Sequence, residues 1–453
     1  MPYIPNTDQE RLEMLGDMGA KNIQELFTNI PEAIQLNRPL EIEGGLTEQD
    51  LDRQLKEKGS WNRSAADGSC FLGGGTWDHS WPSIVDQLSG RSEFLTAYTP
   101  YQPECSQGTL QSIFEFQSMI AELCGMDVAN ASMYDGASSC AEALLLATST
   151  TRRKRVVVSA GLHPDSRATI QTYLKYQNIE IVEAPLRDGV TDWNGFVNPE
   201  TAAVLVQQPN FLGNVESLDP VAASCQETGA LAIASVNPIA LGLLRSPGAA
   251  GFDIVVGEGQ PLGVPMSYGG PHFGFFATRQ KFVRKIPGRL VGASVDQDGR
   301  TAYTLTFQTR EQHIRREKAT SNICTNNALM ALRGCIHLAA LGPQGLEEIA
   351  CVSRQRALQL AEELCAVDGL ELAYPNRPFF NEVAFRAAGG APAVAQFKTA
   401  LSQAGIQAVL PMSKWYEGME GIFTLACTER TRPEDIKRLC AQARNTFRME
   451  ISL

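Results

Sequence analysis

Short, continuously apolar runs alternate with longer amphipathic stretches through the middle of this chain. An apolar run that is rich in β-branched residues is typical of a strand covered on both faces, and the amphipathic stretches between such runs are typical of helices. Alternation of this kind predicts an α/β domain with a mainly parallel sheet between two layers of helices. The expected strands lie at residues 156–159, 179–184, 203–206, 231–234 and 253–256.

An amphipathic stretch at residues 106–123 comes directly before this region. Its apolar residues recur at a spacing of about 3.6, with Gln117 as the one polar exception, and this spacing predicts a helix that buries one face. Gly125 follows the stretch at the place where a glycine often ends a helix.

The two ends of the chain differ from the middle. Residues 1–60 form short helical patterns that Gly and Pro interrupt, whereas the C-terminal part mixes helices with a few strands. We therefore predict a helical N-terminal segment, a large central domain and a smaller C-terminal α+β domain. Their expected bounds are residues 1–90, 91–335 and 336–453.

Composition removes several classes of protein from consideration. The 453 residues are 43% apolar and carry 39 basic and 50 acidic side chains, for a net charge of −11. This balance argues against a disordered chain and against nucleic-acid binding, which usually needs a basic face. We expect no membrane span and no signal peptide, and hence a cytoplasmic protein. None of the eleven cysteines has C-x-x-C spacing, so we predict no metal site.

Two glycine-containing segments are candidates for phosphate binding. Residues 257–263 follow an expected strand, but Pro261 and the spacing of the glycines do not fit a dinucleotide fingerprint. In residues 134–142, the small residues Gly136, Ala137 and Ser138 open an expected helix, whose free amides and dipole suit an anion. A plain helix N-terminus is the alternative for this second segment.

Two polar segments are candidates for ligand or subunit contacts. The loop at residues 98–108 is stiffened by prolines and carries an unusual density of polar side chains, although it could simply cap the helix that follows. Residues 308–326 bring together four cations, two anions and several hydroxyl and amide groups, although a solvated surface helix would show the same composition. The candidate residues are Tyr98, Tyr101, Gln102 and Glu104 in the first segment, and Lys318 and Asn322 in the second.

Five segments together give the chain a family resemblance. They are residues 98–108, 134–137, 207–213, 264–272 and 308–326. In these, the chain resembles the alpha subunits (subunit 1) of two-subunit glycine decarboxylases, the P-proteins of the glycine cleavage system. The resemblance covers essentially the whole chain. It implies the fold-type I architecture of PLP enzymes, with a mainly parallel seven-stranded sheet and a smaller C-terminal domain.

Two positions depart from what PLP chemistry requires. A fold-type I enzyme holds PLP through a lysine and places a carboxylate on the pyridinium nitrogen. Counted back from the turn at residues 269–271, the resemblance puts Gln260 at the position of that lysine, and it puts Asn237 at the position of the carboxylate. The resemblance therefore implies that this chain binds no PLP and that Gly136, Ala137 and Ser138 form a relic of the phosphate loop.

The resemblance also implies a role shared with other proteins. A homologous beta subunit would carry PLP, pair with this chain and assemble with it into an α2β2 tetramer. The complex would decarboxylate glycine and pass the aminomethyl group to the lipoyl arm of the H-protein. This chain would act in trans through Tyr98, Tyr101, Gln102, Glu104, Lys318 and Asn322.

Two alternatives stay open at this point. The chain could be a self-sufficient PLP enzyme that uses a displaced lysine, with Lys281, Lys285 or Lys318 in that role. It could also be a scaffold or binding protein, derived from the same family, without decarboxylase activity.

Overall fold

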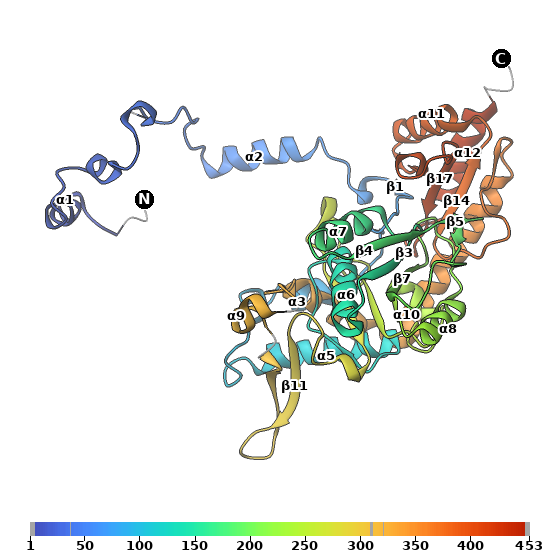
Figure 1. Ribbon diagram of the computed structural model, residues 1–453. Coiled ribbons are helices and arrows are strands. Elements are labelled where there is room, and N and C mark those ends of the chain that lie inside the picture. Colours follow the sequence, from blue (N-terminus) through green and yellow to red (C-terminus); the bar gives the residue numbers. More distant parts are fainter. Residues whose placement is uncertain (1–4, 37, 309–310, 320, 449–453) are drawn as a thin grey trace. The chain divides into compact units, whose positions relative to one another are not determined.

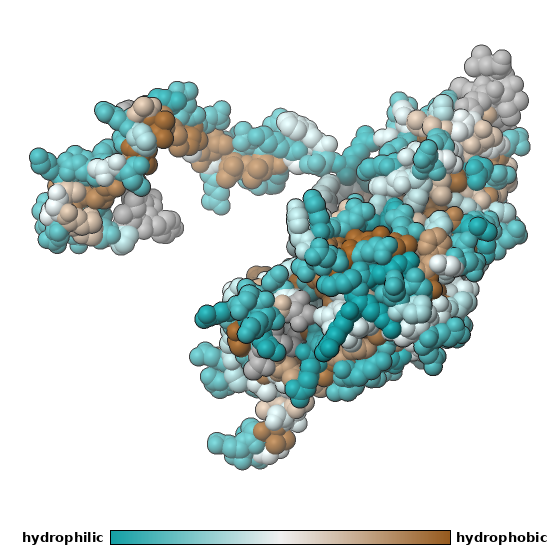
Figure 2. Space-filling model, in the orientation of Figure 1, coloured by the Kyte–Doolittle hydropathy of each residue, from teal (hydrophilic) through white to brown (hydrophobic). Residues whose placement is uncertain are grey.

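The N-terminal part of the protein forms a unit of its own. The computed structural model describes residues 5–36, 38–308, 311–319 and 321–448, and the chain divides into two compact units, residues 1–63 and 64–453. The first unit contains α1 (Asp8–Asp17), the 3-10 turns η1 (Ile23–Phe27) and η2 (Glu32–Ile34), and α2 (Glu48–Gly59) (Figure 1). Apolar side chains are exposed along this unit (Figure 2).

A seven-stranded sheet organises the second unit. Its strand order is β2-β10-β9-β8-β7-β3-β4, in which β4, β3, β7, β8 and β9 are parallel, and β10 is antiparallel to both of its neighbours. The bounds are β2 (Val128–Ala129), β3 (Arg155–Ser159), β4 (Glu180–Ala184), β7 (Thr201–Gln208), β8 (Leu231–Val236), β9 (Ile254–Glu258) and β10 (Gly274–Thr278). This confirms the predicted fold, including all five strands expected from the apolar runs.

Helices cover both faces of this sheet. Because successive side chains of a strand point to opposite faces, one strand contributes to two cores. Val157 of β3 contributes to a core with α5 (Gln107–Cys124), α8 (Leu218–Thr228) and the first half of α10 (Ala328–Cys365). Its neighbours Val156 and Val158 join the opposite core, with α6 (Gly136–Thr151) and α7 (Pro164–Leu174). Burial on both faces explains why β3, β7, β8 and β9 are mostly apolar, whereas the edge strand β4 is partly exposed.

A second sheet carries the C-terminal core. The antiparallel order β13-β14-β17-β16 is flanked by α11 (Gly390–Gln403), α12 (Pro433–Arg448) and the second half of α10. The strand bounds are β13 (Leu370–Leu372), β14 (Glu382–Ala387), β16 (Leu410–Pro411) and β17 (Ile422–Ala426). The predicted boundaries at residues 90 and 335 stay predictions.

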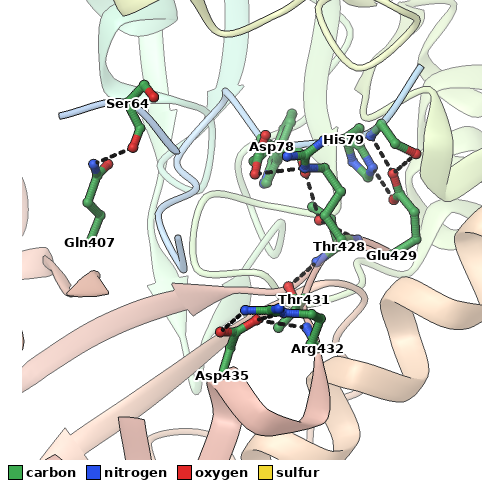
Figure 3. Close-up of polar contacts among 12 residues, drawn as sticks. Ser64, Asp78, His79, Gln407, Thr428, Glu429, Thr431, Arg432 and Asp435 are labelled. Carbon is green, nitrogen blue, oxygen red and sulfur yellow. Dashed lines mark hydrogen bonds and ion pairs between the residues drawn. The ribbon is translucent and has the colours of Figure 1, made fainter. Parts of the chain in front are cut away.

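Residues near the start of the second unit belong to this C-terminal core. β1 (Ser69–Cys70) pairs with β15 (Ile406–Gln407), and the fully buried Phe71 lies among the core side chains. Further along, His79 Nδ1 lies 2.7 Å from a carboxylate oxygen of Glu429, and the Ser80 amide donates to the other oxygen at 2.5 Å (Figure 3). These contacts join segments about 350 residues apart in sequence.

The remaining elements are small. A hairpin of β11 (Leu290–Val295) and β12 (Thr301–Thr306) leads to the short helix α9 (Gln312–Arg315), and two short strands, β5 (Leu186–Arg187) and β6 (Val190–Thr191), pair with each other. The helices α3 (Ser83–Ser89) and α4 (Ser92–Leu95) precede the loop that leads into α5. Among the described residues, no helix is long and apolar enough to span a membrane.

Candidate functional site

A cavity of about 420 Å³ opens at the carboxyl ends of the parallel strands. Gln207 of β7, Ser235 of β8 and Glu258 of β9 line it, and the N-terminus of α6 forms another wall. Open α/β sheets bind their ligands in this place, because loops and helix N-termini converge there. The cavity is therefore where a fold of this class would hold a cofactor.

Two of the N-terminal amides of α6 are already bound to carboxyl groups of this chain. Asp135 is the N-cap, and its Oδ1 accepts a hydrogen bond from the Ser138 amide at 2.7 Å. The Gly136 amide donates to Oε2 of Glu258 at 3.0 Å. A Cβ added at Gly136 would lie 2.9 Å from the backbone nitrogen of Glu258, so the close approach requires glycine. A phosphate could reach the Gly136 amide only by displacing Glu258.

Gln260 is bound to the backbone rather than free to meet a ligand. Its Oε1 accepts from the Trp77 amide at 3.0 Å, while its Nε2 donates to the carbonyls of Trp77 at 3.0 Å and Val264 at 2.8 Å. The residue is 1% exposed. The amide thus holds together two loops that are far apart in sequence, and it uses both its donor and its acceptor to do so.

Asn237 follows β8 and lies in the wall of the cavity. Its Oδ1 accepts from the Ile239 amide at 3.0 Å and so starts the 3-10 turn η4 (Ile239–Gly242). A neutral amide at this position supplies no negative charge to a cofactor ring.

The charge of the cavity does not suit a phosphate. Burial raises the pKa of Glu258 to about 8 and that of Glu382 to about 7, and it lowers the pKa values of His163 and His272. Among the described residues that line the cavity, none is a lysine or an arginine. A phosphate dianion in this cavity would meet carboxyl groups and neutral imidazoles, with no cation to balance its charge.

The polar loop before α5 lies on the surface. Tyr98 is 80% exposed and Tyr101 is 48% exposed, and Gln102 and Glu104 are exposed as well. The Tyr101 hydroxyl accepts a hydrogen bond from Nη2 of Arg289 at 3.2 Å, and the same guanidinium lies 5.5 Å from the centre of the tyrosine ring. The loop therefore presents three side chains to the outside and uses the fourth as an anchor.

The second polar segment lies beside this loop. Glu311 and Arg289 form a buried ion pair at 4.0 Å, and the ring of His313 lies 6.4 Å from that of Tyr101 in an edge-on arrangement. Lys318 and Asn322 are exposed, while Thr320 falls outside the described residues. The structure thus brings the two predicted segments together through Arg289.

The residues expected to act in trans do not line the cavity, while their second segment contacts the residues before α6, where the Cys324 amide donates to the Tyr134 hydroxyl at 3.2 Å. Of the six residues expected to act in trans, none lines the cavity, whereas Asn237, Gly136 and Ala137 do. The displaced lysines do not line it either in the described part of the chain: Lys281 pairs with Asp253 at 2.9 Å, and Lys285 donates to Thr150 at 3.1 Å.

Comparison with known proteins identifies the family. The model of the family described as "Glycine cleavage system P-protein" matches residues 1–442. A relative from Desulforamulus reducens is 46% identical over 445 residues, which cover 98% of this chain and 99% of the relative. The chain belongs to the glycine cleavage system P-protein family.

The relatives also show which P-protein subunit this is. The protein from D. reducens and one from Desulfitobacterium hafniense, also 46% identical, over 97% of this chain and 99% of that relative, both have the name "Probable glycine dehydrogenase (decarboxylating) subunit 1". The chain is accordingly a subunit 1 of glycine dehydrogenase (decarboxylating), and that name implies a partner subunit. The resemblance inferred from the sequence is confirmed.

Solved structures agree with this assignment. One of them is the crystal structure of a glycine decarboxylase (P-protein) of the glycine cleavage system, in inhibitor-bound form. Its TM-score is 0.89 and its sequence is 45% identical, over 98% of this P-protein chain and 100% of that chain. A sphingosine-1-phosphate lyase from Burkholderia pseudomallei and a glutamate decarboxylase from Lactobacillus brevis have TM-scores of 0.67 and 0.68 at 14% and 13% identity. These two share the fold alone.

Sequence reasoning missed several residues that shape the P-protein site. Glu258 ends an apolar strand, and an acid at the carboxyl end of a buried parallel strand is a signal that could have singled it out. Glu382 and Arg289 gave no such signal. The Oε1 of Glu382 accepts from the Gly74 amide at 2.6 Å and Arg289 donates to the Tyr101 hydroxyl, and both of these partners are distant in sequence.

Proposed function

We propose that this chain is the P-protein subunit that carries no PLP. The observation that supports the proposal is a hydrogen bond at the N-terminus of α6. There Glu258 accepts from the Gly136 amide, which a cofactor phosphate would need. Gln260 supports it further, since an amide cannot form an imine and this one is fully hydrogen-bonded to the protein backbone. Asn237 in place of an acid removes the charge that would keep a pyridinium nitrogen protonated.

PLP then belongs to the partner, subunit 2, where it serves as the electron sink for the decarboxylation of glycine. This chain contributes from outside that site. Three side chains are exposed on the loop before α5: Tyr98, Gln102 and Glu104. Lys318 and Asn322 are exposed as well, a few residues after Glu311. Glu311 pairs with Arg289, which in turn donates to Tyr101 of the loop. A cation here could hold the glycine carboxylate, and the hydroxyl and amide groups could orient substrate or cofactor.

The proposed assembly is an α2β2 tetramer that receives the lipoyl arm of the H-protein. A cytoplasmic location stays a prediction from the sequence. The alternative of a scaffold without decarboxylase activity makes the opposite prediction about turnover, so one experiment separates the two.

That experiment compares the purified chain with the chain mixed with subunit 2. We expect the chain alone, after incubation with PLP and dialysis, to show no absorption band of bound PLP and no glycine–bicarbonate exchange. Both should be present in the mixture, and exchange should exceed that of subunit 2 alone. Full activity of the isolated chain would refute the proposal, and a mixture no more active than subunit 2 alone would favour the scaffold.

A lysine at position 260 should not restore a cofactor site. In Gln260→Lys, the ammonium cannot accept the Trp77 amide hydrogen bond, and Glu258 and Asn237 remain in place. We expect no stable PLP absorption, and a free energy of unfolding lower by about 2 kcal/mol or more because a buried amide loses its acceptor. Visible spectra after dialysis and urea unfolding would measure both. Wild-type chain treated in the same way controls for PLP on surface lysines, and a stable band with turnover in the variant would contradict the prediction.

A further inference from the structure

The cavity at the carboxyl ends of the parallel strands has the size of a small-molecule site. Its volume of about 420 Å³ lies within the range of such sites, about 300–1,000 Å³. Its wall includes residues 74–77, 135–137 and 235–237. All lining residues belong to the second unit, so the cavity is formed without the N-terminal segment. The chemistry of the wall then indicates which kind of ligand fits.

The wall of the cavity is acidic. Four carboxyl groups line it, those of Asp135, Asp165, Glu258 and Glu382. The described lining residues include no lysine or arginine that would balance them. A cleft lined by groups of one sign, with walls of low dielectric constant, attracts ions of the opposite sign. The carboxyl groups therefore favour a cationic ligand.

The two histidines of the wall are not cations. Nε2 of His163 lies 2.8 Å from the carbonyl oxygen of Gly74, and its Nδ1 accepts from the Asp165 amide at 3.1 Å. These partners assign a neutral ring with its proton on Nε2. Burial lowers the pKa of His163 and that of His272, so both rings are mostly uncharged near neutral pH. Neither ring repels a bound cation.

One buried donor in the wall has no partner. Asn237 is 7% exposed, and its Oδ1 accepts from the Ile239 amide. Its Nδ2 makes no hydrogen bond within the described part of the chain. A buried donor without an acceptor is costly, and most such groups in native proteins have a partner. An oxygen atom of a ligand at this wall would supply the acceptor.

The wall does not suit a metal ion. The described residues include no group of three or more histidine, cysteine or acidic side chains arranged to hold one. Oε2 of Glu258 already accepts from the Gly136 amide at 3.0 Å, and Oε1 of Glu382 accepts from the Gly74 amide at 2.6 Å. A carboxylate oxygen has two lone pairs, so each can accept a further hydrogen bond from an ammonium group. An organic cation is therefore the better fit.

We propose that this cavity binds a small organic molecule with a primary ammonium group and a neutral oxygen, the chemistry of an amino alcohol. The ammonium group lies among the carboxyl groups of Glu258 and Glu382, and the oxygen accepts from Nδ2 of Asn237. A zwitterion such as glycine fits less well, because nothing in the wall balances its carboxylate. The inference rests on the proposed function, since a chain that held PLP in this cavity would have no room for another ligand.

Calorimetric titration of the purified full chain, dialysed free of PLP, tests the proposal with ethanolamine and 3-amino-1-propanol as probes. At about pH 8 and about 150 mM salt, where primary amines are still mostly protonated and surface charges are screened, we expect saturable binding of at least one amine. Its dissociation constant should be below about 1 mM. Ethylene glycol, which is uncharged, and inorganic phosphate should not bind. Failure of both amines to bind this tightly, or binding of phosphate instead, would overturn the proposal.

Two variants show whether the amine binds in this cavity. Glu382→Gln keeps an oxygen for the Gly74 amide but removes the charge, and Thr169→Phe places a ring on a half-buried residue of the wall. Each should weaken amine binding at least about tenfold. Glu417→Gln removes an exposed carboxylate outside the wall and should change the dissociation constant less than about twofold. Undiminished binding in either cavity variant, with urea unfolding as for wild type, would refute the proposal.

The pH dependence of binding is an independent readout. Burial raises the pKa of Glu258 to about 8 and that of Glu382 to about 7, so both groups are partly protonated near neutral pH. A cation favours their ionised forms, so binding should release protons and strengthen at least about threefold from pH 6 to pH 8. The other titratable groups of the wall are Asp135, Asp165, His163 and His272. An affinity that falls or stays constant over this range would contradict the assignment.

The same samples separate this inference from the proposed function. A band of bound PLP in the isolated chain would defeat the proposed function, and this inference would fall with it. If the chain shows no such band and binds neither amine, the inference is wrong and the proposed function stands.

Discussion

Replacing Glu104 or Tyr98 by alanine should lower glycine–bicarbonate exchange by the reconstituted complex by about 100-fold, the usual cost of removing one group that acts in the transition state. Both side chains are exposed and belong to the loop that we propose to act in trans. Because they contribute little to the interior of this chain, the free energy of unfolding should change by less than about 0.5 kcal/mol. Tyr101 is a less clean choice, since its hydroxyl accepts a hydrogen bond from the buried Arg289.

Matched controls lie on the same chain. Tyr176 is 82% exposed, close to the 80% of Tyr98, and Glu122 is an exposed carboxylate on α5. Alanine at either position should leave exchange within about twofold of wild type, as is usual for surface substitutions. Wild-type activity in both loop variants would show that the loop does not contribute to the partner's site.

Replacing Glu429 by alanine should lower the free energy of unfolding at pH 7 by about 3–5 kcal/mol, the range for removing one member of a buried polar pair. The carboxylate contacts His79 at 2.7 Å and accepts from the Ser80 amide and hydroxyl at 2.5 and 2.9 Å (Figure 3). Alanine leaves the Ser80 amide without this acceptor in a partly buried place. Urea unfolding, with the exposed Glu417→Ala as a control, measures the loss.

The same pair makes the stability depend on pH. Burial alone would raise the pKa of Glu429, but the hydrogen bonds from His79 and Ser80 outweigh it and lower the pKa from 4.5 to about 2. A carboxylate with a depressed pKa stabilises the fold above its unfolded pKa and loses that contribution as the pH falls toward 2. The difference between wild type and Glu429→Ala should therefore shrink as the pH falls below about 4.5. A difference that keeps growing below that pH would contradict this assignment.

His337 adds to the loss of stability in acid. Burial, which is the main cause, and the nearby His79 lower its pKa from 6.5 to about 4. The unfolded chain therefore takes up a proton at this position before the folded chain does, and the wild-type protein should already lose stability as the pH falls from 6.5 to 4.

Local signals in the sequence were enough to locate much of the fold. The five predicted runs became β3, β4, β7, β8 and β9. In β3, β7, β8 and β9, the apolar run follows from burial on both faces of the sheet, whereas β4 lies at the edge and is partly exposed. Gly125 ends α5 in the left-handed conformation, with a φ of 66°, as its place after the amphipathic stretch predicts. Such features depend on residues within a few positions of one another.

The candidate site could be predicted only in part. The sequence singled out Gln260 and Asn237 through a resemblance, and it singled out two polar segments by their composition. It gave no sign that Arg289 contacts Tyr101 or that Glu258 accepts from the amide of Gly136, since each of these two contacts links residues more than a hundred positions apart. The role proposed for the six exposed residues stays a prediction.

The sequence by itself determined the class of fold, the family and the absence of a lysine at position 260, because these depend on residue identity and on short-range periodicity. Only the tertiary structure decided what fills the α6 N-terminus and where the polar loops lie relative to the cavity. The physical reason is that hydrogen-bond pairing and burial depend on which distant segments meet, and a pattern along the chain does not record that.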